Sequence, residues 1–527
     1  MNRKSNNPIK GYFTSNENII SYPSVLNITA EIFNGISYPH TPAIHFENGS
    51  LTYQQLLEKV NQVANYLSNN YKVTPGTRIL LNGFNSRYLA ISWLAVLKLG
   101  CIAVTTVSLL KERELDSVLE LSDAELIIFD ANNKEEILKV AEKHNILDKT
   151  IFFNSGENNS LEYLIEDEAV SFDPIKTFAD DIAIIAFTSG STGIPKGTLH
   201  THRDLMYICD CFPKDILKIR STDIICGTPP LAFTYGLGGM LLFPLRYGAS
   251  VVLIDKLSPE KLLVAIEKYQ VTICFSSPTA YKLMLSLLLR YSIKSLKKCV
   301  SAGEHLPTHT FEQWKKLTGI SIIDGIGSTE MLHIFISTEA QYIKPGATGK
   351  PIPGYLAKIV DEEGNELAPN KIGLLAVIGP TGCQYLDKNQ QQKYIRNGWN
   401  ITGDLYYKDE DDYYYFYARA DDAIISSGYN IAPTEIENII LEYPNIEDCI
   451  VVGVLDSMKG HLIKAYVKLK NCENLSNLPE NESDALISNI KNHVKSKLAI
   501  YKCPHQIEFT DSIPRNLVGK VQKYKLR

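Results

Sequence analysis

The sequence lacks the features that would mark a secreted, membrane-spanning or nucleic-acid-binding protein. Residues 1–17 are polar and contain no apolar signal core. The largely apolar stretch 90–110 is interrupted by Lys98 and Gly100, so it is read as a buried helix that runs into a buried strand. There is no excess of positive charge, and the net charge of −6 gives no bulk attraction to nucleic acid or anionic membrane.

The ten cysteines are scattered and form neither a CxxC pair nor a Cys/His metal-ligand spacing. Only Cys209 and Cys211 lie close together in the sequence. Internal repeats and low-complexity segments are also missing. These absences predict a cytoplasmic protein with a reduced interior and no cysteine-bound metal. What remains is an ordinary composition, and 527 residues with 45% hydrophobic and 21% charged side chains allow two to four domains.

Strand and helix patterns alternate over the first half of the chain. Thr52-x-x-Gln55 has the form of a capping box, followed by apolar residues on one helical face. Such alternation with short connections indicates an α/β fold with parallel sheets covered by helices. The expected strands are 78–81, 101–106, 126–130, 182–187, 251–254 and 271–275, and further helices are expected at 89–99, 112–121 and 259–269.

The chain changes character after the aromatic run 413–417. A charged break, Arg419-Ala-Asp421-Asp422, is followed by a helix capped at Thr434-x-x-Glu437, by strands at 449–455 and 463–469, and by a helix at 484–498. The sequence therefore predicts a large domain, 1–418, and a small α/β domain, 419–527.

A loop rich in glycine and hydroxyl groups, 188–197, follows the expected strand 182–187. Glycines let backbone N–H groups approach an anion, hydroxyls add donors, and Lys196 adds a positive charge. The spacing of Gly190 and Gly193 does not fit the Walker pattern, so the loop is no ordinary P-loop. It indicates phosphate binding, with a plain surface turn as the alternative.

Two later stretches end in a carboxylate. Asp324-Gly-Ile-Gly-Ser-Thr-Glu330 follows apolar residues 320–323, and Glu330 suits a magnesium ion that bridges phosphates. The alternative is a glutamate at a helix N-terminus. In Thr402-Gly-Asp404 the carboxylate could accept hydrogen bonds from ribose hydroxyls, although a turn is the simpler interpretation of this short motif.

Five motifs follow one another along the chain: Thr188 to Gly197, Asp324 to Glu330, Thr402 to Asp404, Arg419 with Gly428, and Pro514 to Lys520. In this order they make the chain resemble the acyl-adenylate-forming family. That family comprises acyl- and aryl-CoA synthetases, stand-alone adenylation domains and firefly-type luciferases. The segments 229–238, 301–307 and 324–335 are most similar to benzoate- and 2-aminobenzoate-CoA ligases. Ala418 departs from the glycine that is common before the hinge arginine, which puts the local turn in question.

The resemblance implies a large N-terminal domain of mixed and parallel sheets with a small mobile C-terminal α/β domain. It also implies site residues. The catalytic group is Thr329, Glu330 (also the Mg²⁺ ligand), the hinge residue Asp421, and Lys520. The ATP-binding group is Thr188, Ser189, Gly190, Ser191, Thr192, Gly193, Lys196, Ser301, Ala302, Gly303, Asp324, Gly325, Asp404 and Arg419. The acyl-binding group is Phe233, Tyr235, Gly236, Gly327 and His333, and the CoA-binding group is Ser427 and Gly428.

The implied activity is that of an ATP-dependent aryl-CoA ligase, with ATP, Mg²⁺ and coenzyme A. The rival interpretation is a stand-alone adenylation enzyme that loads an aromatic acid onto the phosphopantetheine arm of a carrier protein. A non-catalytic relative is disfavoured because Glu330, Asp404 and Lys520 are all present. His333 either bonds a ring substituent or is a core histidine satisfied by the backbone. The expected partners are small molecules, with a carrier protein in the rival case and neither nucleic acid nor membrane, and the expected state is a monomer or homodimer.

Overall fold

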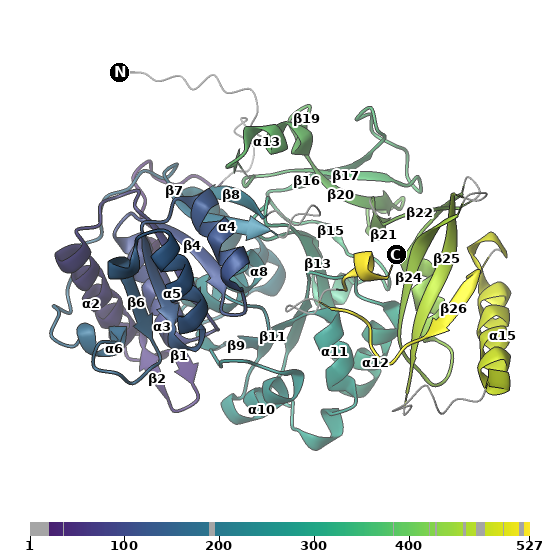
Figure 1. The fold of residues 1–527 in the computed structure, drawn as a ribbon, viewed down its shortest axis with the longest axis horizontal. Helices are drawn as coiled ribbons and strands as arrows, with labels where there is room; N and C mark the ends of the chain where they lie inside the picture. Colours follow the sequence, from purple (N-terminus) through teal and green to yellow (C-terminus); the bar gives the residue numbers. More distant parts are fainter. Residues whose placement is uncertain are drawn as a thin grey trace.

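The computed structural model describes residues 20–34, 36–188, 195–382, 384–420, 422–426, 429–456, 460–470, 480–498, 500–515 and 521–526. Figure 1 shows two large sheets with their helices at one side and in the middle of the molecule, a smaller sheet above them, and the C-terminal sheet at the opposite side. Among the helices in these ranges, none is both long and apolar enough to cross a membrane. The α/β class with a large N-terminal part and a smaller C-terminal part is confirmed.

The first sheet has seven strands and is parallel from β7 to β6, as the alternating pattern predicts. β8 and β18 extend it in the antiparallel sense. In spatial order its strands are β18 (Gln384–Tyr385), β8 (Lys196–Thr201), β7 (Ile182–Thr188), β4 (Ile102–Val107), β3 (Arg78–Gly83), β5 (Leu126–Asp130) and β6 (Thr150–Phe153).

The second sheet has nine strands, with a parallel centre and antiparallel strands at both edges. In spatial order they are β15 (Lys350–Pro351), β14 (Ile334–Ser337), β13 (Ile322–Gly327), β12 (Lys298–Ser301), β11 (Ile273–Ser276), β9 (Ile224–Gly227), β10 (Ser250–Val252), β1 (Pro42–Phe46) and β2 (Gly49–Thr52). The expected glycine loop after residue 323 is partly wrong, because β13 continues through Gly327 by pairing with β14.

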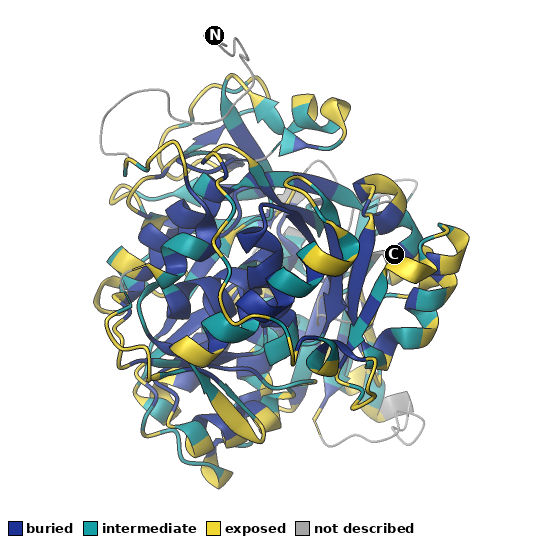
Figure 2. Ribbon diagram, turned by 90° about the vertical axis from the view of Figure 1, so that its left-hand side faces the viewer, coloured by how far each residue is buried: buried dark blue, intermediate teal, exposed yellow. Residues whose placement is uncertain are grey.

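The helices cover the sheets, and their inward faces are buried while their outer faces are exposed (Figure 2). They are α1 (Ile28–Phe33), α2 (Tyr53–Tyr71), α3 (Arg87–Lys98), α4 (Glu112–Ser122), α5 (Lys134–Lys143), α6 (Leu161–Leu164), α7 (His202–Asp210), α8 (Thr234–Leu237), α9 (Phe243–Arg246), α10 (Pro259–Tyr269), α11 (Pro278–Leu285), α12 (Thr308–Thr318), α13 (Lys388–Tyr394), α14 (Pro433–Leu441) and α15 (Glu480–Lys497).

Two helix starts test the capping predictions. Thr52 caps α2, and its hydroxyl and the Gln55 side chain form both bonds of the capping box. The box expected at Thr434 is wrong, because α14 begins at Pro433 after Ala432. The Thr434 hydroxyl instead donates to the Tyr417 carbonyl, and the Glu437 carboxylate accepts from the Val451 N–H. These two side chains therefore tie α14 to neighbouring strands.

A third, antiparallel sheet was not predicted from the sequence. It consists of β16 (Leu356–Val360), β17 (Gly373–Ile378), β20 (Trp399–Lys408), β19 (Ile395–Arg396) and β21 (Tyr414–Arg419). The turn interpretation of Thr402-Gly-Asp404 is wrong, since these residues lie within β20. Gly403 nevertheless has φ +77, a conformation that favours glycine.

The C-terminal part has a sheet and an apolar core of its own. Its strands are β23 (Tyr429–Ile431), β22 (Ile424–Ser426), β25 (Gly460–Leu469), β24 (Ile446–Asp456) and β26 (Gln506–Phe509). Apolar residues from β24, β25, α14 and α15 form one buried cluster that is separate from the clusters of the larger sheets. Such a core stabilises this part independently of its neighbour.

Candidate active site

The predicted phosphate loop sits on a β-hairpin of the first sheet. Thr188 is the last residue of β7 and lies directly opposite Lys196, the first residue of β8. The hairpin holds the two ends of the loop together at the edge where the parallel strands end. Ser189, Gly190, Ser191, Thr192 and Gly193 lie outside the described residues.

The turn that carries Thr329 and Glu330 is fixed to the same hairpin by two side chains. His200 of β8 donates through Nε2 to the Thr329 carbonyl, 2.7 Å away, and burial lowers the pKa of His200 to about 4, so the ring is neutral. The Tyr385 hydroxyl donates to Glu330 Oε1 at 2.6 Å, and Tyr385 pairs with Thr198 of β8. The phosphate hairpin and the acidic turn are thus one rigid unit.

This unit fits the expected magnesium ion. Within the described ranges no three His, Cys, Asp or Glu side chains gather into a metal-binding group. Mg²⁺ bound beside phosphates takes only one or two carboxylates and fills its other positions with phosphate oxygens and water. Glu330 is half-buried beside the hairpin and can supply that single carboxylate.

The predicted adenine slot lies at the ends of β12 and β13. Ser301 is the last residue of β12, and its Cα lies opposite that of Asp324 on β13. Burial raises the pKa of Asp324 to about 7. Asp324 Oδ1 is buried and has no hydrogen-bond partner among the described residues, so it can receive a ligand N–H.

The remaining slot residues need small side chains. Ala302 is 5% exposed, and Gly303 has φ +88, which favours glycine. A Cβ on Gly325 would lie 2.9 Å from two side-chain carbons of Ile334. The predicted adenine slot therefore requires small side chains at these positions.

The raised pKa of Asp324 predicts a pH-dependent stability. The pKa of Asp324 is about 7 in the folded protein and the ordinary 3.8 in the unfolded chain, so the folded state binds the carboxyl proton more tightly. The stability that this proton contributes is therefore lost as pH rises from about 4 to 7. Asp324→Asn cannot titrate. Between pH 5 and 8 the unfolding free energy of wild type should therefore fall relative to that of the variant by about 2–3 kcal/mol. Urea unfolding of both proteins from pH 5 to 8 measures this, and parallel profiles would contradict it.

Asp404 and Arg419, the predicted ribose-binding pair, face each other on β20 and β21. Arg419 NH1 lies 2.8 Å from Asp404 Oδ1, and the Asp404 residue is 8% exposed. The guanidinium holds the carboxylate in one orientation, which suits acceptance of two hydroxyl protons from a ribose.

The predicted acyl pocket centres on His333, which is 3% exposed. Its ring centroid lies 4.6 Å from Phe243, edge to face, 5.7 Å from Tyr235 and 5.8 Å from Phe212. Neither ring nitrogen has a hydrogen-bond partner among the described residues, and burial lowers the pKa of His333 to about 3.

The other acyl-pocket residues surround this ring. Phe233 is half-buried just before α8, and the Tyr235 hydroxyl lies 3.2 Å from the Val300 carbonyl. A Cβ on Gly236 would lie 2.0 Å from the Pro230 oxygen, and one on Gly327 would lie 2.6 Å from the His333 oxygen. Both glycines are required by backbone contact and do not simply leave room for a ligand.

Sequence reasoning missed His200, Tyr385, Phe212 and Phe243. His200 stands three residues after Gly197, so its nearness to the phosphate loop was a signal, whereas the others come from distant segments. Lys520, Asp421, Ser427 and Gly428 lie outside the described residues.

The family model for AMP-binding enzyme matches residues 35–384, and that for AMP-binding enzyme C-terminal domain matches residues 435–520. Benzoate--CoA ligase of Thauera aromatica is 32% identical over 487 residues, 91% of each chain.

Two solved proteins are similar over nearly the whole chain. The anthranilate CoA ligase AuaEII with anthranoyl-AMP is 31% identical, with a TM-score of 0.90 over 96% of this chain and 97% of that one. MatB from Rhodopseudomonas palustris is 26% identical over 95% of this chain and 98% of that one. Its ATP-bound structure has a TM-score of 0.86 and its apo structure 0.77.

Proposed function

Because the chain belongs to the AMP-binding enzyme family, we propose that it is an ATP-dependent ligase that joins an aromatic carboxylic acid of the benzoate or 2-aminobenzoate type to coenzyme A. The observation that supports an aromatic substrate is the environment of His333. A neutral, buried ring with two unpartnered nitrogens lies among three aromatic side chains, on the same turn as Glu330. A planar acid bound against these rings would offer the His333 ring a polar substituent.

The reaction has two steps. A carboxylate oxygen attacks the α-phosphorus of ATP, the bond to the bridging oxygen breaks, and pyrophosphate leaves with the electron pair. The thiol sulfur of coenzyme A then attacks the acyl carbonyl, AMP leaves, and the thiol proton is released. The first step is needed because a free carboxylate has no usable leaving group.

The residues of this chain take distinct parts in the first step. The hairpin from Thr188 to Lys196 surrounds the β- and γ-phosphates, and Thr329 and Glu330 meet the α-phosphate side. When bound at Glu330, Mg²⁺ neutralises phosphate charge. Lys520 stabilises the negative charge that grows between the carboxylate and α-phosphate oxygens.

Nucleotide recognition and thiol delivery use the other predicted residues. Asp324 accepts an adenine N–H, and Asp404, oriented by Arg419, accepts the ribose hydroxyl protons. Ser427 and Gly428 contact the pantetheine arm of coenzyme A as its thiol approaches the acyl carbonyl. We propose a boundary between the two domains at 418/419, at the end of β21, and β22 is the first strand of the C-terminal sheet along the chain.

Pyrophosphate exchange over a panel of acids tests the function. Benzoate and aminobenzoates should support exchange, and fatty acids beyond about eight carbons should not, because each overpacked contact costs roughly 1–3 kcal/mol. Thioester formation is then measured with coenzyme A and with a holo carrier protein. Exchange with palmitate and none with benzoates would overturn the proposal, and transfer to the carrier alone would favour the carrier-loading enzyme.

The role of His333 gives a separate prediction. If a ring nitrogen bonds the amino group, His333→Ala should lower kcat/KM for 2-aminobenzoate more than for benzoate, by about tenfold for each ~1.4 kcal/mol lost. Phe212→Leu is the matched control, because it changes the aromatic wall without removing a hydrogen-bonding group. Equal losses on both acids for His333→Ala would show that the ring only fills space.

A further inference from the structure

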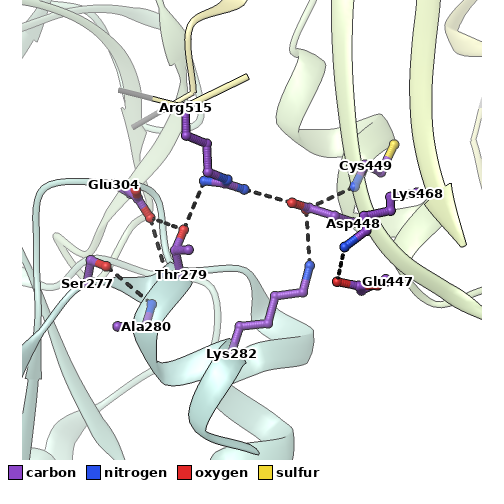
Figure 3. Close-up of polar contacts among 10 residues, drawn as sticks. All are labelled: Ser277, Thr279, Ala280, Lys282, Glu304, Glu447, Asp448, Cys449, Lys468 and Arg515. Carbon is purple, nitrogen blue, oxygen red and sulfur yellow. Dashed lines mark hydrogen bonds and ion pairs between the residues drawn. The ribbon is translucent and has the colours of Figure 1, made fainter. Parts of the chain in front are cut away.

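A polar cluster joins the C-terminal sheet to helix α11 (Figure 3). Arg515 NH2 lies 2.7 Å from Asp448 Oδ2, and Lys282 Nζ lies 3.1 Å from Asp448 Oδ1. Arg515 NH1 also donates to the Thr279 hydroxyl at 3.1 Å. We call Thr279, Lys282, Asp448 and Arg515 the α11 latch.

The α11 latch is built from both parts of the molecule. Thr279 and Lys282 belong to α11 in the large part, whereas Asp448 of β24 and Arg515 belong to the C-terminal part. Burial by itself raises the pKa of Asp448, but the charges of Lys282 and Arg515 outweigh it and hold that pKa below its ordinary value. The Asp448 carboxylate is therefore ionised at neutral pH and pairs with one cation from each part of the molecule, Lys282 and Arg515.

Arg515 stands at the base of the segment that ends in Lys520. Arg515 and Val521 form a β-bridge, and the Gln522 N–H donates to the Pro514 carbonyl at 2.8 Å. The residues on either side of 516–520 are thus paired with each other. Arg515, one of these residues, also binds Thr279 of α11. A shift of Arg515 would therefore move the start of the chain segment that contains Lys520.

The same contacts continue to the predicted adenine slot. The Thr279 hydroxyl donates to Glu304 Oε2 at 2.6 Å while it accepts from Arg515, which satisfies both roles of the hydroxyl. The Thr279 N–H also donates to that oxygen, at 3.2 Å. Glu304 directly follows Gly303, so one chain of hydrogen bonds runs from the nucleotide-binding segment to the base of the lysine segment.

The arrangement of this chain is closer to one solved state than to another. It superposes on ATP-bound MatB with a TM-score of 0.86 and on apo MatB with 0.77, and on the anthranoyl-AMP complex with 0.90. We propose that Arg515, Asp448 and Lys282 are positioning residues that hold the C-terminal sheet on α11 for adenylation, and that their contacts must break before thioester formation. This inference rests on the proposed two-step function.

The structure offers a matched control beside the cluster. Lys468 Nζ lies 2.6 Å from Glu447 Oε1, and both residues belong to the C-terminal sheet (Figure 3). Glu447→Gln removes an ion pair next to Asp448 in sequence without touching α11. It should leave both half-reactions unchanged.

The test measures the two half-reactions separately, adenylation by pyrophosphate exchange and transfer from supplied acyl-adenylate to coenzyme A. Lys282→Gln should lower adenylation about fivefold and Arg515→Ala about tenfold or more, with transfer unchanged or faster. Arg515→Lys should recover only part of the loss, because an ammonium cannot span two acceptors as a guanidinium does. Salt should lower adenylation in wild type more than in Lys282→Gln.

A double-mutant cycle separates the latch from general stability. Lys282→Gln and Asp448→Asn should be less than additive on adenylation, while each melting temperature stays near that of wild type. Hydrogen exchange without substrates should be faster in α11 and β24 of the latch variants than in Glu447→Gln. Equal losses in both half-reactions, additivity, or unchanged exchange would each overturn the proposal.

The outcomes remain separable from those of the proposed function. If wild type activates an acid of another class, the aromatic assignment fails and the latch is tested with that acid. If wild type activates none of the acids, the hydrogen-exchange comparison alone decides whether Lys282 and Asp448 hold the two parts together.

Discussion

Replacing Lys520 by alanine should lower acyl-adenylate formation by at least about a hundredfold, the typical effect of losing one charge contact to a transition state. The loss falls on this step because negative charge concentrates between the carboxylate and α-phosphate oxygens as the new bond forms. Conversion of a supplied acyl-adenylate to the thioester should stay nearly intact. Lys525→Ala is the control, because it removes an exposed lysine close to Lys520 in the sequence.

The converse defect is expected at the charged break between the domains. Adenylation needs Lys520 in the site, whereas thioester formation needs a thiol to approach the same carbonyl, so one arrangement can hardly serve both. Asp421→Pro fixes φ at the proposed hinge and should spare adenylation while it blocks transfer. The rates of adenylation and of transfer are measured separately for Lys520→Ala and Asp421→Pro. If each variant lost both half-reactions equally, there would be no case for domain alternation.

The features that the sequence predicted well are local ones. The capping box at Thr52 needs only residues three apart, and the apolar run 182–187 by itself predicts strand β7. Buried parallel strands such as 126–130 are readable because both faces are apolar. Thr434 shows the limit of the local pattern, because the hydroxyl finds a better partner in the distant Tyr417 carbonyl.

The supports of the candidate site could not be predicted because their partners are far apart in the chain. His200 reaches Thr329 across 129 positions, and Tyr385 reaches Glu330 across 55. The sequence predicted the acidic turn and the phosphate loop separately, and the structure joins them through His200 and through the pairing of β18 with β8. Likewise, the aromatic wall around His333 includes Phe212 from a segment without any motif.

Glu330→Gln should lower pyrophosphate exchange by at least about a hundredfold and raise the Mg²⁺ concentration needed for half-maximal rate. The substitution keeps the shape of the side chain, and its amide oxygen can still accept from the Tyr385 hydroxyl, so the turn should stay in place. What is lost is the negative charge that holds the cation beside the phosphates.

Tyr385→Phe separates charge from position in the same turn. It leaves the carboxylate but removes one charge-assisted hydrogen bond, worth about 1.5–3 kcal/mol. Exchange should therefore fall about tenfold, with a smaller change in Mg²⁺ dependence than in Glu330→Gln, because the carboxylate can still bind the cation from a less defined orientation. Exchange rates over a Mg²⁺ titration, with melting temperatures of both variants, measure this. An unchanged Mg²⁺ dependence in Glu330→Gln would mean that the carboxylate serves only to anchor Tyr385.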